Sequence, residues 1–155
     1  MNKQKNKKPI YLKAKLTTYP YVKDRIEYYQ NELELIYYKM QGTSSSSNFS
    51  DTIKTSAGYQ YIPRIRKDSP SYKNMTVELS DQLDEVQSRL NKYLEEYAEI
   101  ERLIESIPDN QDKELVYDCY IKGHTHKQLS IKYSYPDENY INKKISSILK
   151  KVELD

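Results

Sequence analysis

Apolar residues repeat with the spacing of a coiled coil in two separate stretches of the chain. Within 18–41 they alternate at intervals of three and four: Tyr19, Val22, Ile26, Tyr29, Leu33, Ile36 and Met40. Within 75–108 the same alternation continues: Leu79, Leu83, Val86, Leu90, Tyr93, Tyr97, Ile100, Ile104 and Ile107. Such spacing gathers apolar side chains on one stripe of a helix. It predicts two long coiled-coil helices, which pair either within one chain as an antiparallel hairpin or between chains.

The stretches that precede these two helices lack a sustained apolar pattern. Residues 42–74 are polar, open with Gly42 and a run of serines, and contain Pro63 and Pro70, which predicts a flexible linker. Tyr59, Tyr61, Ile62 and Ile65 leave open a short strand-like patch or a docking segment. In residues 1–17 lysines interrupt the apolar residues, so we expect a loose basic N-terminal arm and no signal peptide.

Residues 109–155 follow a different pattern, that of three short helices. The first is predicted from Asn110 to Lys122, with Gly123 as its C-terminal stop. Thr125 and Gln128 have the spacing of a capping box that starts a second, short helix. A turn over 134–137 leads to a third helix, whose inward positions are Ile141, Ile145, Ile148, Leu149 and Val152. A short helix, a tight turn and a longer helix in this order describe a helix-turn-helix.

The stretch from Tyr120 to Ser130 resembles a known DNA-binding sequence. It reads Tyr-Ile-Lys-Gly-His-Thr-His-Lys-Gln-Leu-Ser, similar to the Tyr-x-x-Gly-x-Ser/Thr-x-x-Glu-Ile-Ala stretch in the C-terminal region of bacterial sigma factors. Gln128 and Ser130 depart mildly from that pattern, and Pro136 lengthens the turn. The whole arrangement resembles phage transcriptional regulators of the RinA and ArpU type. The resemblance implies double-stranded DNA binding and activation of phage late genes. Host RNA polymerase is a further candidate partner, which the acidic helix of residues 75–109 would contact. Without a signal peptide or a membrane segment, we expect a cytoplasmic protein of the bacterial host.

Charge is strongly segregated, although the net charge is only +2 over 155 residues. Residues 75–109 carry three basic and ten acidic side chains, whereas residues 120–152 carry seven lysines against Asp137 and Glu138. Lysines supply the sequence-independent attraction to phosphates, and the first turns of the third helix enter the major groove in this motif. The candidate DNA-binding residues are Lys122, His126, Lys127, Lys132, Asn139, Tyr140, Asn142, Lys143 and Lys144. For Tyr140, packing against the second helix is an equal alternative.

The composition argues against several other classes of protein. The single cysteine, Cys119, excludes an intrachain disulfide and a multi-cysteine zinc site. His124 and His126 have no further metal ligand at useful spacing, and no catalytic motif or phosphate loop is present. We therefore expect an all-α protein, not an enzyme, with no cofactor and no membrane segment. A homodimer through helices 18–41 and 75–108 is the preferred assembly. The alternative function is a phage assembly, packaging or polymerase-adaptor protein in which the coiled coil is the main functional surface.

Overall fold

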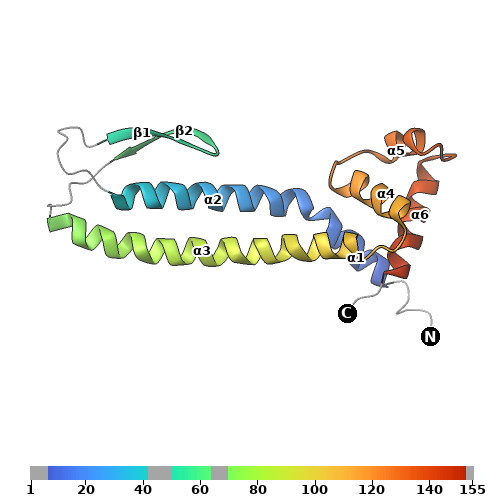
Figure 1. Ribbon diagram of the computed structural model, residues 1–155, viewed down its shortest axis with the longest axis horizontal. Helices are drawn as coiled ribbons and strands as arrows, with labels where there is room; N and C mark the ends of the chain where they lie inside the picture. The colour runs from blue at the N-terminus through green and yellow to red at the C-terminus, as the bar shows by residue number, and fades with distance from the viewer. Residues whose placement is uncertain (1–6, 42–49, 64–69, 153–155) are drawn as a thin grey trace. The chain divides into compact units, whose positions relative to one another are not determined.

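The structure, a computed structural model, describes residues 7–41, 50–63 and 70–152, and it is mostly helical (Figure 1). The elements are α1 (Lys7–Thr17), α2 (Tyr19–Gln41), β1 (Ser50–Thr55), β2 (Gly58–Pro63), α3 (Pro70–Glu105), α4 (Asn110–Tyr120), α5 (His126–Lys132) and α6 (Glu138–Lys151). They form two compact units, whose boundaries fall after Val22 and after Glu95. The hairpin unit holds most of α2 and α3 with both strands. The terminal unit holds α1, the start of α2, the end of α3 and α4–α6.

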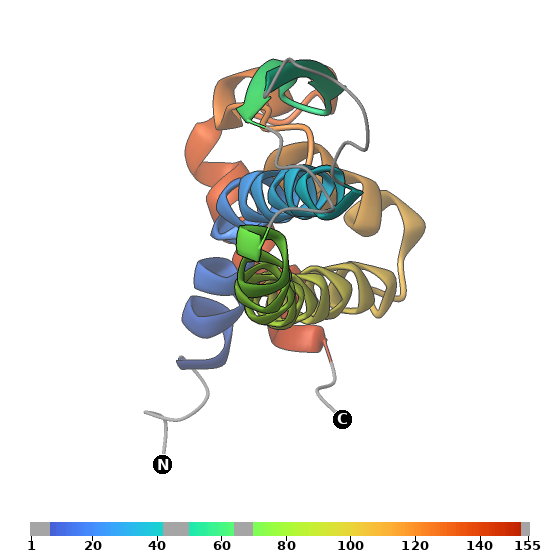
Figure 2. The same ribbon diagram turned by 90° about the vertical axis from the view of Figure 1, so that its left-hand side faces the viewer.

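In the hairpin unit the two apolar seams face each other within one chain. Figures 1 and 2 both show α2 lying between α3 and the two strands. The rings of Tyr29 and Tyr93 stack with centroids 5.8 Å apart. The buried apolar side chains of this unit are Leu33, Ile36, Leu79 and Leu90. The antiparallel intrachain pairing is therefore the one observed, and the seam tyrosines pack as expected.

The two strands form an antiparallel hairpin in the segment expected to be a linker. Their register runs from Thr55↔Gly58 to Ser50↔Pro63, and Thr55 Oγ1 donates to Gly58 O at 3.0 Å. The backbone N–H and the hydroxyl of Ser56 donate to the Glu34 carboxylate of α2 at 3.2 and 3.1 Å. The linker prediction is thus wrong for 50–63 and from Pro70 onwards, because contacts with α2 that composition does not reveal stabilise the hairpin. Residues 42–49 and 64–69, Ile65 among them, lie outside the described residues.

Helix α1 replaces most of the loose arm expected at the N-terminus. It packs on α6, and the side chains of Leu12 and Leu16 are completely buried. The Lys8 ammonium donates to the carbonyl of Val152, just after α6. The arm prediction is wrong for 7–17 because two leucines four residues apart suffice for one apolar face when a partner helix covers them. Residues 1–6 lie outside the described part of the chain.

Helices α4, α5 and α6 follow the predicted order, and a capping side chain starts each of them. The Asp109 carboxylate accepts from Asp112 N at 2.9 Å, and that of Asp137 from Tyr140 N at 2.7 Å. Thr125 forms the predicted capping box with Gln128. Gly123 has a positive φ of 72°, although α4 already ends at Tyr120. The buried apolar side chains from α4 onwards are Leu115, Val116, Leu129, Ile141, Ile145, Ile148, Leu149 and Val152, and those of α6 are the ones predicted.

Candidate nucleic-acid interface

A tight turn fixes where α6 begins after α5. Ser134 has a positive φ of 56°, the left-handed conformation that often ends a helix. Tyr135 N donates to Ser130 O at 2.9 Å, and Ser134 N donates to Ile131 O at 3.3 Å. These two bonds make a Schellman motif, which closes α5 before Asp137 caps α6. Backbone hydrogen bonds therefore define where α5 ends and the turn to α6 begins.

The left-handed conformation of Ser134 gives a first testable prediction. A side chain costs about 1 kcal/mol or more in this conformation, and glycine avoids that cost. We expect Ser134→Gly to raise the free energy of unfolding by about 0.5–1 kcal/mol, measured by urea denaturation. Ser147→Gly, inside α6, is the control: it should lower stability by about 0.5 kcal/mol. A loss of stability in Ser134→Gly would contradict the turn geometry.

One face of α6 is exposed along its whole length. Asn139, Lys143, Ser147 and Lys150 recur at helical spacing on the side opposite the buried isoleucines, and all four are exposed. Among the described residues, no ion pair engages Lys143 or Lys150. Helices α1 and α4 lie at the two borders of this face, because Asn142 contacts Lys13 and Lys144 contacts Asp112. We call these four residues the open face of α6.

Several predicted DNA-binding residues instead hold the terminal unit together. Lys144 Nζ lies 3.4 Å from Asp112 Oδ1 on α4, and its pKa is raised by that carboxylate. Lys122 and Lys132 both form ion pairs with Asp118, whose side chain is completely buried. Three of the nine candidates, Lys122, Lys132 and Lys144, therefore have a carboxylate partner within the terminal unit.

The Asp118 carboxylate is the centre of a buried polar cluster. Lys122 Nζ lies 2.8 Å from Oδ1, while Lys132 and Tyr133 donate to Oδ2, the latter at 2.8 Å. Burial by itself raises the pKa of Asp118, but the hydrogen bonds from these three residues outweigh it and hold the pKa well below its usual range. The i,i+4 spacing of Asp118 and Lys122 was the one signal in the sequence for this cluster. The cluster joins α4 to α5.

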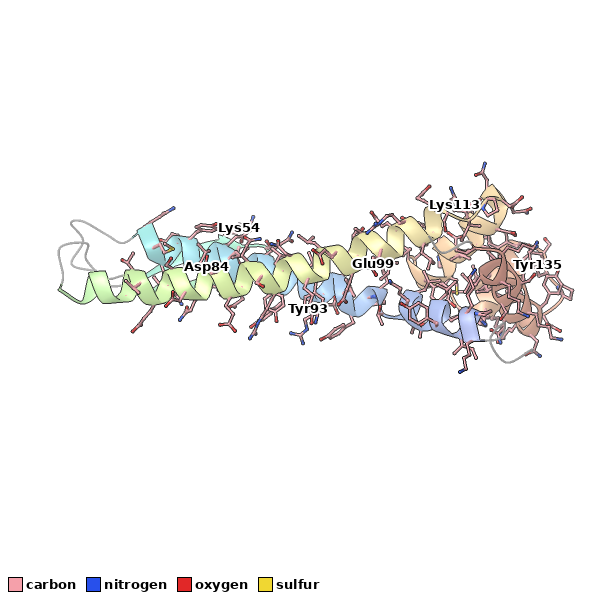
Figure 3. The ribbon with its side chains drawn as sticks, turned by 90° about the horizontal axis from the view of Figure 1, so that it is seen from below. Lys54, Asp84, Tyr93, Glu99, Lys113 and Tyr135 are labelled. Carbon is pink, nitrogen blue, oxygen red and sulfur yellow. The ribbon has the colours of Figure 1, made fainter. Side chains whose placement is uncertain are left out.

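The other candidates lie around the turn and at the start of α5. Tyr140 is 41% exposed, and its ring centroid lies 4.8 Å from that of Tyr135 in the turn, so it packs there while keeping an exposed edge. Tyr135, labelled in Figure 3, in turn stacks on Tyr133 at 6.1 Å. His126 is half-buried and Lys127 is exposed in the first turn of α5.

Much of the acidic surface of α3 in the terminal unit has partners there. Glu99 accepts from Lys15 of α1, which lowers the pKa of Glu99. Glu105 lies 3.0 Å from Nζ of Lys113 on α4 (Glu99 and Lys113 are labelled in Figure 3). Hydrogen bonding to Glu101 raises the pKa of Tyr97. Glu99 and Glu105 therefore link α3 to α1 and α4, although both side chains stay exposed to solvent.

The other hollows and side-chain clusters among the described residues do not offer a second candidate site beside the open face of α6. An open groove of about 360 Å³ in the hairpin unit is lined by Arg25, Tyr28 and Arg89, among others. Its arginines already have partners, because Arg89 forms an ion pair with Glu85 and Arg25 lies over the Tyr28 ring. Within the described ranges, no group of three or more His, Cys, Asp or Glu residues is placed to hold a metal ion. No helix described is both long and apolar enough to cross a membrane.

Cys119 lies half-buried on α4, as a small residue of the helix interface. Burial raises the pKa of its thiol, partly offset by the nearby Lys13 ammonium. A thiol with a raised pKa is a poor nucleophile at neutral pH, so this side chain is a packing residue.

Comparison of the chain with protein-family models, with curated proteins and with solved structures found no match.

Proposed function

We propose that the chain is a transcription regulator that binds double-stranded DNA through a helix-turn-helix made of α5 and α6. The observation that carries the proposal is the open face of α6, with Lys143 and Lys150 exposed and outside any ion pair among the described residues. A capped turn presents this face, and buried isoleucines hold α6 from behind. In a helix-turn-helix, the outward residues of the second helix enter the major groove.

The side chains of the open face suit both contacts to DNA phosphates and contacts to bases. Lys143 and Lys150 supply positive charge for phosphates, and Lys127 adds to it from α5. Asn139, in the first turn of α6, offers the amide that pairs with adenine in the major groove. Lys122, Lys132 and Lys144 are better assigned to the fold, because each already has a carboxylate partner. Activation of phage late genes, implied by the sigma-like stretch before α5, is part of this proposal.

A homodimer through the coiled-coil helices remains a prediction, but the surface that would form its interface changes. The seams of α2 and α3 face each other within one chain, as the Tyr29–Tyr93 stack shows in the hairpin unit. A homodimer through 18–41 and 75–108 would therefore use the outer faces of these helices. A second copy would double the number of DNA-reading helices on one duplex and raise affinity by multivalency alone.

The salt dependence of DNA binding tests the proposal. When a substitution removes one lysine–phosphate contact, the slope of log K against log salt falls in magnitude by about 0.9. We expect this change in Lys143→Gln and again in Lys150→Gln, measured by fluorescence anisotropy with a duplex selected from a random library. Lys92→Gln is the matched control, since Lys92 is an exposed lysine of α3 in the hairpin unit.

Two results would contradict the proposal. One is a wild-type chain with full helix content that selects no duplex from the library. The other is an equal salt slope in wild type, Lys143→Gln and Lys150→Gln. The lysine pair at 143 and 144 is a poorer choice for this test, because Lys144→Gln would also disrupt the ion pair with Asp112.

A further inference from the structure

A lysine of α1 holds the side chain of Asn142 at the border of the open face. Lys13 Nζ donates to Asn142 Oδ1 at 2.7 Å and to Ser146 Oγ at 2.6 Å. Ser146 Oγ donates in turn to the backbone carbonyl of Asn142 at 2.9 Å. An ammonium group has donors and no acceptor, so only the oxygen of the Asn142 amide can face it. The orientation of this amide is therefore fixed by chemistry.

Helix α1 keeps Lys13 in place against α6. Leu12 is the preceding residue and Leu16 lies one turn later, and both are completely buried. The ion pair of Lys15 with Glu99 and the bond from Lys8 to Val152 O anchor the helix on either side. Asn142 itself is exposed. Its Nδ2 group is therefore the half of the amide that remains for a ligand.

The free half of an asparagine amide determines which base it reads. An unrestrained asparagine pairs with adenine by accepting from N6 with its oxygen and donating to N7 with its NH₂. Guanine presents two acceptors on the same edge, O6 and N7. When Lys13 donates to the oxygen, one of its two lone pairs is occupied and the ammonium beside it disfavours the approach of the adenine N6 donor, so donation from Nδ2 becomes the main contact with a base.

We propose that Lys13 makes Asn142 act mainly as a hydrogen-bond donor, so that it selects guanine over adenine at one position of the DNA site. This inference rests on the proposed DNA binding and makes α1 part of the reading surface. Lys13 acts here as a positioning residue, since it sets what Asn142 presents.

Selection from a random duplex library by the full-length chain tests the inference. Wild type should enrich guanine at one position, and Asn142→Ala should lose that preference. Lys13→Met keeps the length of the side chain but removes the donors, so adenine should replace guanine there. Discrimination by a good bidentate pair corresponds to roughly fivefold to a hundredfold in affinity. Lys13→Arg retains donors and should keep guanine.

The hydrogen bond by which Lys13 orients the Asn142 amide, here called the lock, can also be measured without DNA. The ¹H–¹⁵N signal of the Asn142 side-chain amide, assigned by its absence in Asn142→Ala, should shift in Lys13→Met. An unchanged signal would overturn the lock while leaving DNA binding intact. The same conclusion follows if wild type and Lys13→Met select the same base, or if wild type selects adenine. A wild-type chain of full helix content that selects no duplex overturns DNA binding and this inference with it.

Discussion

Replacing Leu16 with alanine is expected to lower the free energy of unfolding of the terminal unit by about 2–5 kcal/mol, the range for buried leucines. Leu16 is completely buried in α1, which packs on α6. The substitution removes apolar contact and leaves a cavity that the surrounding helices fill only in part. Urea denaturation followed by circular dichroism at 222 nm measures the loss.

The matched control lies on the same helix. Ile10 is 69% exposed, so Ile10→Ala should change stability by no more than about 0.5 kcal/mol. Equal, small effects of the two substitutions would mean that 7–17 is the loose arm expected from the sequence. A large effect for Leu16 alone establishes α1 as part of the folded unit.

Asp118→Asn is expected to cost about 2–3 kcal/mol at neutral pH. Hydrogen bonds to a charged group contribute roughly 1.5–3 kcal/mol each, and the variant lacks the charge that Lys122 and Lys132 share. The loss stays below that of a fully buried ion pair, because both lysines are about half exposed and turn to water. Urea denaturation at pH 7 measures it.

The cost of Asp118→Asn should shrink as the solution becomes acidic. The pKa of Asp118 is lowered in the folded state, so its contribution is complete above the unfolded pKa of about 4. Below that value the unfolded chain takes up the proton first, and the contribution is lost as the pH falls towards the folded pKa. We therefore expect the stabilities of wild type and variant to converge between about pH 4 and pH 2.

Glu114→Gln provides the comparison on the same helix. Glu114 is exposed and lies 3.9 Å from Lys132, so its removal should cost less than about 1 kcal/mol. If Asp118→Asn and Glu114→Gln proved equal at pH 7, the buried carboxylate would not be the junction between α4 and α5.

The elements predicted correctly are those encoded by near neighbours in the sequence. The alternation from Leu79 to Ile107 places every member of the seam on the buried or half-buried side. Thr125 with Gln128, and Asp137 with Tyr140 N, close local rings that any chain with this sequence can form. Local signals therefore predict the helices of the site and the start of α6.

The contacts that could not be predicted from the sequence join residues far apart in the chain. Lys13 meets Asn142 only because α1 docks on α6, and Ser56 meets Glu34 only because the strands lie on α2. For the same reason, a count of lysines overestimates the number that have no carboxylate partner. The carboxylate at Asp118 occupies two of them, at 122 and 132.

The docking of α1 on α6 also determines when the protein can fold during translation. Lys13 and its acceptor Asn142 are 129 residues apart in the chain. At about 5–20 residues per second, α1 leaves the ribosome roughly 6–26 s before its partner. All strands and long helices of the hairpin unit emerge in that interval. Leu12 and Leu16 thus stay exposed on the nascent chain during this interval, and the surface proposed to bind DNA is completed last.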